Sequence, residues 1–295
     1  SPFLGGFRLR TRLFALALLL GAVPLSAQGL KVPATVDTLP NGLRLIVHED
    51  ASAPIVTVNV WYHTGSGSEK SGRTGFAHLF EHLMFMGSEN APYPAFDRML
   101  EAAGANNNGS TTEDRTNYYE SGPVSALPLM LWLEADRMGS LLPAMTEEKL
   151  ANQRDVVQNE KRQGDNQPYG KVFELILKQL FPPDHPYSWE AIGSMEDLNA
   201  ASLDDVRHWF ETWYGPNNAV VVIAGDVSSD EAFAKAEKYF GDIPPGPAAT
   251  RLEEWIPAHA QPRRQQMQDR VAQARLYMAW TGPRWGTRDA HQLEL

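Results

Sequence analysis

The sequence contains no cysteine. This absence excludes disulfide bonds, a thiolate nucleophile and cysteine-based structural zinc, so any zinc site would need histidine and carboxylate ligands. A lipoprotein is excluded as well, because there is no cysteine to acylate. Basic residues are also scarce, with 26 Lys and Arg against 36 Asp and Glu and a net charge of −10. Such an acidic chain is unsuited to bind nucleic acid.

The apolar run near the N-terminus is too short to span a membrane. Residues 13–25 form this run, which follows Arg8, Arg10 and Arg12 and ends near small residues, as in a secretory signal peptide. We expect a signal peptide over residues 1–27, a periplasmic mature protein and no membrane span after cleavage. A mitochondrial presequence is the alternative, because no acidic residue precedes Asp37.

The rest of the sequence alternates between strand-like and helix-like segments. An Asn41-Gly42 turn within residues 36–47 predicts a β-hairpin, and the alternation over residues 54–63 predicts a central strand. Further strands are expected at residues 106–112, 116–122 and 218–223, and helices at 93–103, 125–138, 146–162, 170–180, 203–214 and 229–240. The predicted fold class is α+β, with a mostly antiparallel sheet covered by helices.

A proline-rich stretch divides the chain. We expect a catalytic domain over residues 34–245, a linker over residues 246–262, and the truncated start of a second, similar domain over residues 263–295. Residues 265–281 resemble a strand that resumes after the linker, and a helix is expected from Thr287 onward.

The segment His78-Leu-Phe-Glu-His82 is the most informative part of the sequence. At about 100° per residue, His78, Glu81 and His82 share one face of a helix. The pattern matches the H-x-x-E-H signature of inverzincins, which indicates two zinc ligands and a catalytic base. The surrounding residues 75–87 are almost wholly apolar, which indicates a buried helix. Burying ionisable groups in such a helix costs free energy unless they bind a metal or are otherwise paired. The competing interpretation is that the two residues are hydrogen-bonded core histidines.

A catalytic zinc needs a third protein ligand and an open position for water. The sequence offers five candidates for that ligand: His185, His208, Glu147, Glu148 and Glu160. Glu160 shares a helical stripe with Gln153 and Val157, so it can face inward. The alternative for Glu160 is a solvated side chain beside Lys161, and spacing alone leaves the choice open.

The order of motifs along the chain resembles the pitrilysin/insulysin family, which includes the mitochondrial-processing-peptidase-like proteins. Besides the zinc motif and Glu160, the matching segments are Asn41-Gly-Leu43, Gly75-Phe-Ala-His78, Asn108-Gly-Ser-Thr-Thr112, Thr116-Asn-Tyr-Tyr119, His185-Pro-Tyr187, Ile192-Gly193, Tyr214-Gly-Pro-Asn-Asn218 and Val221-Val-Ile-Ala-Gly-Asp226. They extend over about residues 34–245. The resemblance implies a zinc endopeptidase that hydrolyses extended or unfolded peptides, built from pairs of similar α+β domains around a chamber.

The resemblance also implies a role for individual residues. His78, His82 and Glu160 would bind one zinc ion per chain, and Glu81 would be the general base. The strand around Asn108 and Gly109 would bind an extended peptide through its backbone. A C-terminal half, or a partner subunit of the same family, would supply an Arg and a Tyr that bind substrate and stabilise the oxyanion.

Two positions depart from the family pattern. Gln153 stands where a second glutamate is common; an amide still orients a ligand by hydrogen bonding but adds no negative charge. Gly109 stands where alanine is usual, which loosens the strand. Tyr118 and Tyr119 point to opposite faces, so at least one is expected in the core. The alternative functions are a non-catalytic peptide-binding or scaffold partner of an active subunit, and another metal hydrolase on the same fold.

Overall fold

The computed structural model describes residues 32–250, 257, 259 and 261–294. The predicted signal peptide at residues 1–27 lies outside the described residues, as do residues 251–256 of the predicted linker. In the part of the chain that is described, no helix combines the length and the apolar character needed to cross a bilayer.

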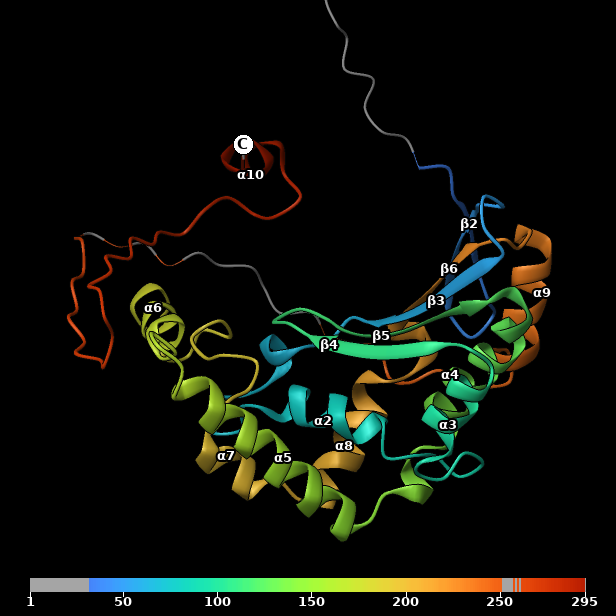
Figure 1. The fold of residues 1–295 in the computed structure, drawn as a ribbon, viewed down its shortest axis with the longest axis horizontal. Coiled ribbons are helices and arrows are strands. Elements are labelled where there is room, and N and C mark those ends of the chain that lie inside the picture. The colour runs from blue at the N-terminus through green and yellow to red at the C-terminus, as the bar shows by residue number, and fades with distance from the viewer. Residues whose placement is uncertain (1–31, 251–256, 258, 260, 295) are drawn as a thin grey trace, which may run out of the picture. The chain divides into compact units, whose positions relative to one another are not determined.

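A six-stranded sheet in the order β1-β2-β6-β3-β5-β4 forms the frame of the fold (Figure 1). The β2–β6 pair is parallel and the other neighbouring pairs are antiparallel. This confirms the predicted α+β class with a mostly antiparallel sheet. The strands are β1 (Thr35–Thr38), β2 (Arg44–Glu49), β3 (Ile55–Tyr62), β4 (Asn106–Thr111), β5 (Thr116–Pro123) and β6 (Ala219–Gly225).

Helices α2, α3, α4, α5, α7 and α8 lie on one side of this sheet (Figure 1). In β3, Val58 and Val60 are buried while Thr57 and Asn59 are partly exposed, because successive strand residues point to opposite faces. The helices are α2 (Phe76–Met84), α3 (Ala95–Ala102), α4 (Leu127–Ser140), α5 (Glu147–Asp165), α6 (Val172–Leu180), α7 (Met195–Ala200), α8 (Leu203–Trp213), α9 (Ser229–Phe240) and α10 (Arg288–Leu293).

The predicted hairpin, central strand and long helices are all present, with bounds shifted by a few residues. The turn between β1 and β2 places Gly42 at φ 90°, a conformation that glycine adopts without steric cost. Helix α7 was not predicted. Its local signal is Ser194, whose side chain accepts a hydrogen bond from the Asp197 N–H and so caps the helix.

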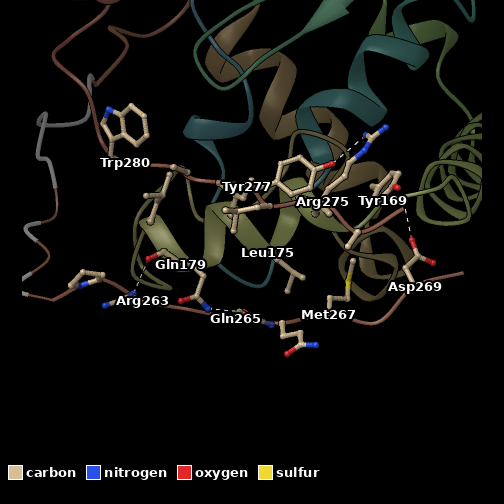
Figure 2. Close-up of a pocket in the computed structure, with 18 of the residues that line it drawn as sticks. Tyr169, Leu175, Gln179, Arg263, Gln265, Met267, Asp269, Arg275, Tyr277 and Trp280 are labelled. Carbon is tan, nitrogen blue, oxygen red and sulfur yellow. Dashed lines mark hydrogen bonds between the residues drawn. The ribbon is translucent and has the colours of Figure 1, made fainter. Parts of the chain in front are cut away.

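The strand expected over residues 265–281 is wrong, because these residues form no strand in the structure. The segment instead lies against α6 through side-chain contacts (Figure 2). Gln179 of α6 donates to the Gln265 side-chain oxygen at 2.8 Å. Just before α6, the Tyr169 N–H donates to Asp269 Oδ2 at 3.0 Å, and the Tyr169 hydroxyl donates to the Gln273 carbonyl at 2.6 Å. A strand needs a ladder of backbone hydrogen bonds to a neighbouring strand, which these contacts do not provide. A pocket of about 720 Å³ lies between this segment and α6.

Candidate metal centre

Helix α2 carries the three ionisable residues of the H-x-x-E-H motif. The motif's apolar neighbours hold the helix in the core, where five of them are at most 1% exposed: Ala77, Leu79, Phe80, Leu83 and Met84. His78 and His82 lie on the remaining face, with side chains 20% and 19% exposed. Core packing therefore fixes the helix while both imidazoles stay accessible.

The structure brings Glu160 of α5 to the two histidines of α2. Glu160 Oε2 lies 3.8 Å from His78 Nε2 and 3.5 Å from His82 Nε2. Zinc bonds of about 2.0–2.2 Å at tetrahedral angles separate ligand atoms by about 3.3–3.6 Å. The three side chains therefore fit a zinc ion with little adjustment. They offer ligand atoms that all lie within 4.8 Å of one another.

The protonation of His78 and the hydrogen bonding of His82 suit metal binding. Burial, and then the charge of neighbouring His82, lower the pKa of His78 to about 4, so this imidazole is neutral at physiological pH. His82 Nδ1 lies 3.3 Å from the side-chain oxygen of Gln153. A proton on that Nδ1 donates to the amide and leaves Nε2 with its lone pair toward Glu160. Gln153 thus lies where its side chain can orient the His82 ring.

Glu81 shares the face of the histidines but is not part of the ligand cluster. Its Oε2 accepts a hydrogen bond of 2.5 Å from the Thr111 hydroxyl on β4. Burial raises the pKa of Glu81, and the bond from Thr111 opposes that rise. Sequence reasoning missed Thr111. The sequence feature that could have identified it is its position two residues after Gly109, which puts both residues on the same face of the strand.

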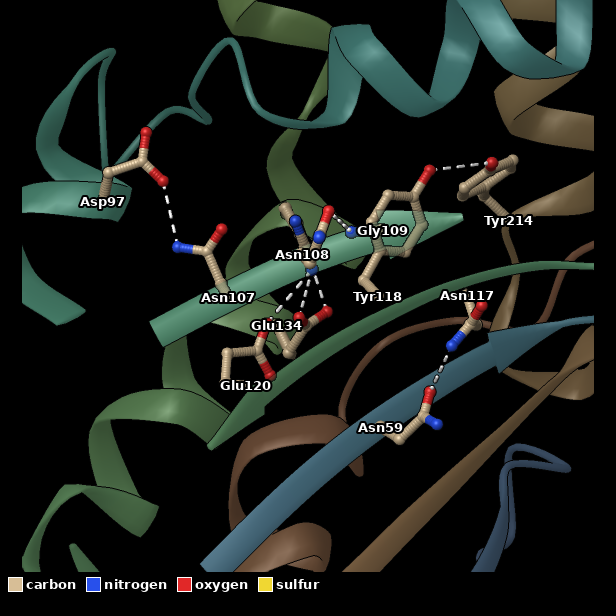
Figure 3. Close-up of polar contacts among 11 residues, drawn as sticks. Asn59, Asp97, Asn107, Asn108, Gly109, Asn117, Tyr118, Glu120, Glu134 and Tyr214 are labelled. Atoms are coloured by element: carbon tan, nitrogen blue, oxygen red, sulfur yellow. Dashed lines mark hydrogen bonds and ion pairs between the residues drawn. The ribbon is translucent and has the colours of Figure 1, made fainter. Parts of the chain in front are cut away.

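Strand β4 passes directly beside Glu81. A Cβ atom on Gly109 would lie 3.2 Å from Glu81 Oε1, so the glycine leaves space next to the base. β4 is the last strand in the sheet order, and its Gly109 N–H donates to the Asn108 side chain at 2.8 Å (Figure 3). Asn108 and Gly109 therefore lie on an edge strand next to the ionisable cluster.

A buried ionic cluster supports β5 behind this edge. Arg137 of α4 forms ion pairs with Glu134 and Glu120, two carboxylates that lie side by side in Figure 3. Its guanidinium lies 4.4 Å from the centre of the Tyr118 ring. Tyr118 is fully buried, while Tyr119 on the opposite face is only partly buried. The expectation that at least one of these tyrosines is in the core is confirmed.

The remaining candidates for the third ligand do not join the cluster. Among the described residues, the group of side chains able to share one metal ion consists of His78, His82 and Glu160. His185 is buried and packs against the Phe181 ring, with ring centres 4.5 Å apart. The other three candidates are likewise absent from the group: Glu147, Glu148 and His208.

Two family models match the chain in succession. The model for insulinase, peptidase family M16, matches residues 44–185, and the model for the peptidase M16 inactive domain matches residues 200–295. The zinc protease PqqE of Helicobacter pylori is 34% identical over 208 residues, which are 70% of this chain and 46% of that protein. Human mitochondrial cytochrome b-c1 complex subunit 1 is 29% identical over 276 residues, or 91% of this chain and 56% of that protein.

Solved structures agree with these matches. A protease from Helicobacter pylori superposes with a TM-score of 0.69 at 31% identity, covering 77% of this chain and 53% of that one. The fold is that of a peptidase M16 domain. This chain belongs to the insulinase family, peptidase family M16, which confirms the resemblance drawn from its motifs. It spans about half the length of the curated relatives it matches.

Proposed function

We propose that this chain carries the catalytic site of a zinc endopeptidase that hydrolyses extended or unfolded peptides. The observation that carries this proposal is the convergence of His78, His82 and Glu160 from two helices, with Glu81 beside them. When bound there, a zinc ion would polarise the scissile carbonyl and lower the pKa of a water molecule. The name of the relative PqqE, a zinc protease, supports the choice of metal.

The protein's own groups then have separate tasks. His78 and His82 would hold the ion from α2, and Glu160 from α5. Thr111 holds Glu81 Oε2, which leaves Oε1, the oxygen beside Gly109, to take the proton of the attacking water. The same carboxyl would later deliver that proton to the leaving amine.

The edge of β4 is the proposed binding surface for the peptide. An extended substrate would add to the sheet there through backbone hydrogen bonds, a mode that depends little on side-chain identity. Such a peptide would lie next to Glu81 because Gly109 does. For the Gly109 N–H to bind a substrate carbonyl, the Asn108 side chain must release its hydrogen bond to that group.

The proposal extends to the organisation and location of the protein. We propose a catalytic domain over residues 34–245, a linker over residues 246–262 and the start of a second, related domain over residues 263–295. A C-terminal half or a partner subunit of the same family would complete the enzyme, since the matched relatives are about twice as long. We further propose a periplasmic protein, because residues 1–27 have the sequence pattern of a signal peptide, with a mitochondrial location as the alternative.

A non-catalytic scaffold or peptide-binding partner is the second candidate function. The match of residues 200–295 to a model named for an inactive domain favours it, as does the similarity to a cytochrome b-c1 subunit. Against it stands the retention of His78, Glu81, His82 and Glu160 in one cluster. Another metal hydrolase on this fold is the third candidate.

A Glu81→Gln variant of the full-length protein tests the proposed function. The substitution removes the base but no ligand, so zinc content stays at the parental value. Turnover of a quenched fluorescent, unstructured peptide should fall about 10²–10⁴-fold, the usual contribution of a general base. A parent that holds zinc but cleaves no peptide would support the scaffold. Unchanged turnover in the variant would overturn the proposed role of Glu81.

A further inference from the structure

We propose that Glu69, which lies outside the H-x-x-E-H motif, positions the metal-binding helix by accepting hydrogen bonds from the amides at its N-terminus. Glu69 is neither a ligand nor a catalytic residue in this proposal. The inference rests on the proposed metal site, because its effect is on the placement of His78, Glu81 and His82.

Helix α2 begins without a side-chain cap of its own. Its N-cap residue is Gly75 at φ 84°, which has no side chain to accept a hydrogen bond. The first amides of a helix have no acceptor within the helix. Glu69 supplies one from outside the helix: its Oε2 accepts from the Gly75 N–H at 3.1 Å and its Oε1 accepts from the Ala77 N–H at 2.7 Å.

The environment of Glu69 makes these contacts strong. Glu69 is only 8% exposed. Burying a carboxyl group costs free energy unless the group is hydrogen-bonded. Burial raises the pKa of Glu69 to about 8, and the hydrogen bonds from the Ala77 and Gly75 amides oppose the rise. The two hydrogen bonds, rather than a full negative charge at neutral pH, therefore hold the start of the helix.

The contacts act next to the first proposed metal ligand, since Ala77 directly precedes His78. Helix α2 has nine residues, too few to hold its geometry without outside contacts. The backbone of Ile192 closes the other side, because a Cβ atom on Gly75 would lie 2.5 Å from the Ile192 carbonyl oxygen. Glu69 therefore sets where α2 starts, and with it the placement of both histidines relative to Glu160 on α5.

Zinc titration of the full 295-residue chain and its Glu69→Gln variant tests the proposal. Glutamine keeps the size of the side chain but turns an NH₂ group toward one of the two amides. We expect zinc affinity to fall about 10–100-fold, as when an outer partner of a ligand is lost. The absorption spectrum of bound Co²⁺ should change, while the helix content measured by circular dichroism stays the same.

Glu49 offers a matched control at another helix. Its Oε1 accepts a hydrogen bond from the Ser229 N–H at 2.8 Å, at the N-terminus of α9, which carries none of the proposed ligands. Glu49→Gln makes the same chemical change and should leave zinc affinity and the Co²⁺ spectrum at the parental values. A drop equal to that of Glu69→Gln would show that the effect is not specific to α2 and would overturn the proposal.

The remaining outcomes also decide. Parental zinc affinity and spectrum in Glu69→Gln would overturn the proposal even with a lower Tm, because Glu69 would then only stabilise the fold. If Glu69→Gln does not fold, Glu69→Asp is titrated with zinc instead. The shorter side chain of aspartate reaches only one of the two amides, so we expect weaker zinc binding than in the parent. Parental zinc binding in Glu69→Asp would overturn the proposal. Failure of both variants to fold would show that Glu69 serves folding as a whole and would overturn the proposal. Absence of zinc from the parent chain would overturn the proposed function, and the inference with it.

Discussion

The two helices that hold the candidate ligands differ in their surroundings. Helix α2 is packed in the core, and its His78 and His82 side chains are 20% and 19% exposed. Helix α5 faces solvent over much of its length, and its Glu160 side chain is 42% exposed. The comparison teaches that two of the candidate ligands are fixed by core packing, whereas the third comes from a surface helix. A bound ion would therefore join a rigid element to a more adaptable one.

Substituting one candidate ligand on each helix should give the largest changes in zinc affinity, and the two changes should be unequal. His78→Ala removes a nitrogen ligand from the rigid helix and should abolish stoichiometric zinc binding. Glu160→Gln keeps a neutral oxygen in place on the exposed helix, so it should weaken zinc binding without abolishing it. Competition titration with a chelator measures both affinities. Equal losses would contradict the difference between the two helices.

Removal of the Thr111 hydroxyl should give an intermediate effect on catalysis. Glu81 must be ionised to act as a base, so the rate falls as pH drops through its pKa. Burial raises that pKa above the ordinary value of 4.5, and the Thr111 hydrogen bond lowers it. Thr111→Val should therefore move the acidic limb of the kcat/KM profile to higher pH and reduce the rate severalfold at neutral pH.

Thr57 provides the control for the pH profile. Its hydroxyl lies 2.7 Å from that of Ser121 in the same sheet, away from Glu81. Thr57→Val loses a comparable hydrogen bond and should leave the acidic limb in place. An unshifted limb in Thr111→Val would contradict the role assigned to that hydroxyl.

The smallest effect is expected at Gln153, on the exposed helix. Gln153→Glu places a charge near His82 Nδ1, which lies 3.3 Å from the present amide oxygen. A carboxylate there makes the ligand more basic, so zinc affinity or rate should rise modestly. Gln163→Glu adds the same charge at an exposed position of α5 and should change neither. An inactive parent that gains activity from Gln153→Glu would show that the natural chain is not a competent catalyst.

Local patterns predicted the frame of the fold well. The alternation of β3 and the Asn41-Gly42 turn follow directly from side-chain direction and backbone conformation. The face shared by His78 and His82 is likewise a local property of a helix. Residues 265–281 were predicted wrongly as a strand because a β-like pattern does not reveal whether a neighbouring strand is present.

The rest of the site depends on contacts between distant segments. Spacing left Glu160 as one of several candidates, since its approach to α2 is a tertiary contact; the family resemblance singled it out. Thr111 meets Glu81 across 30 positions, and Glu69 reaches Ala77 across eight, so neither partner could be identified from periodicity. Sequence patterns predicted the chemistry, and the structure adds residues that contact the candidate site.

Metal analysis of the purified chain tests the central claim most directly, because every assigned role depends on the cluster of His78, His82 and Glu160. The account predicts about one zinc ion per chain, removable by chelator, with the same stoichiometry in Glu81→Gln because that residue is not a ligand. A zinc-saturated and desalted chain that retains no stoichiometric zinc would contradict it.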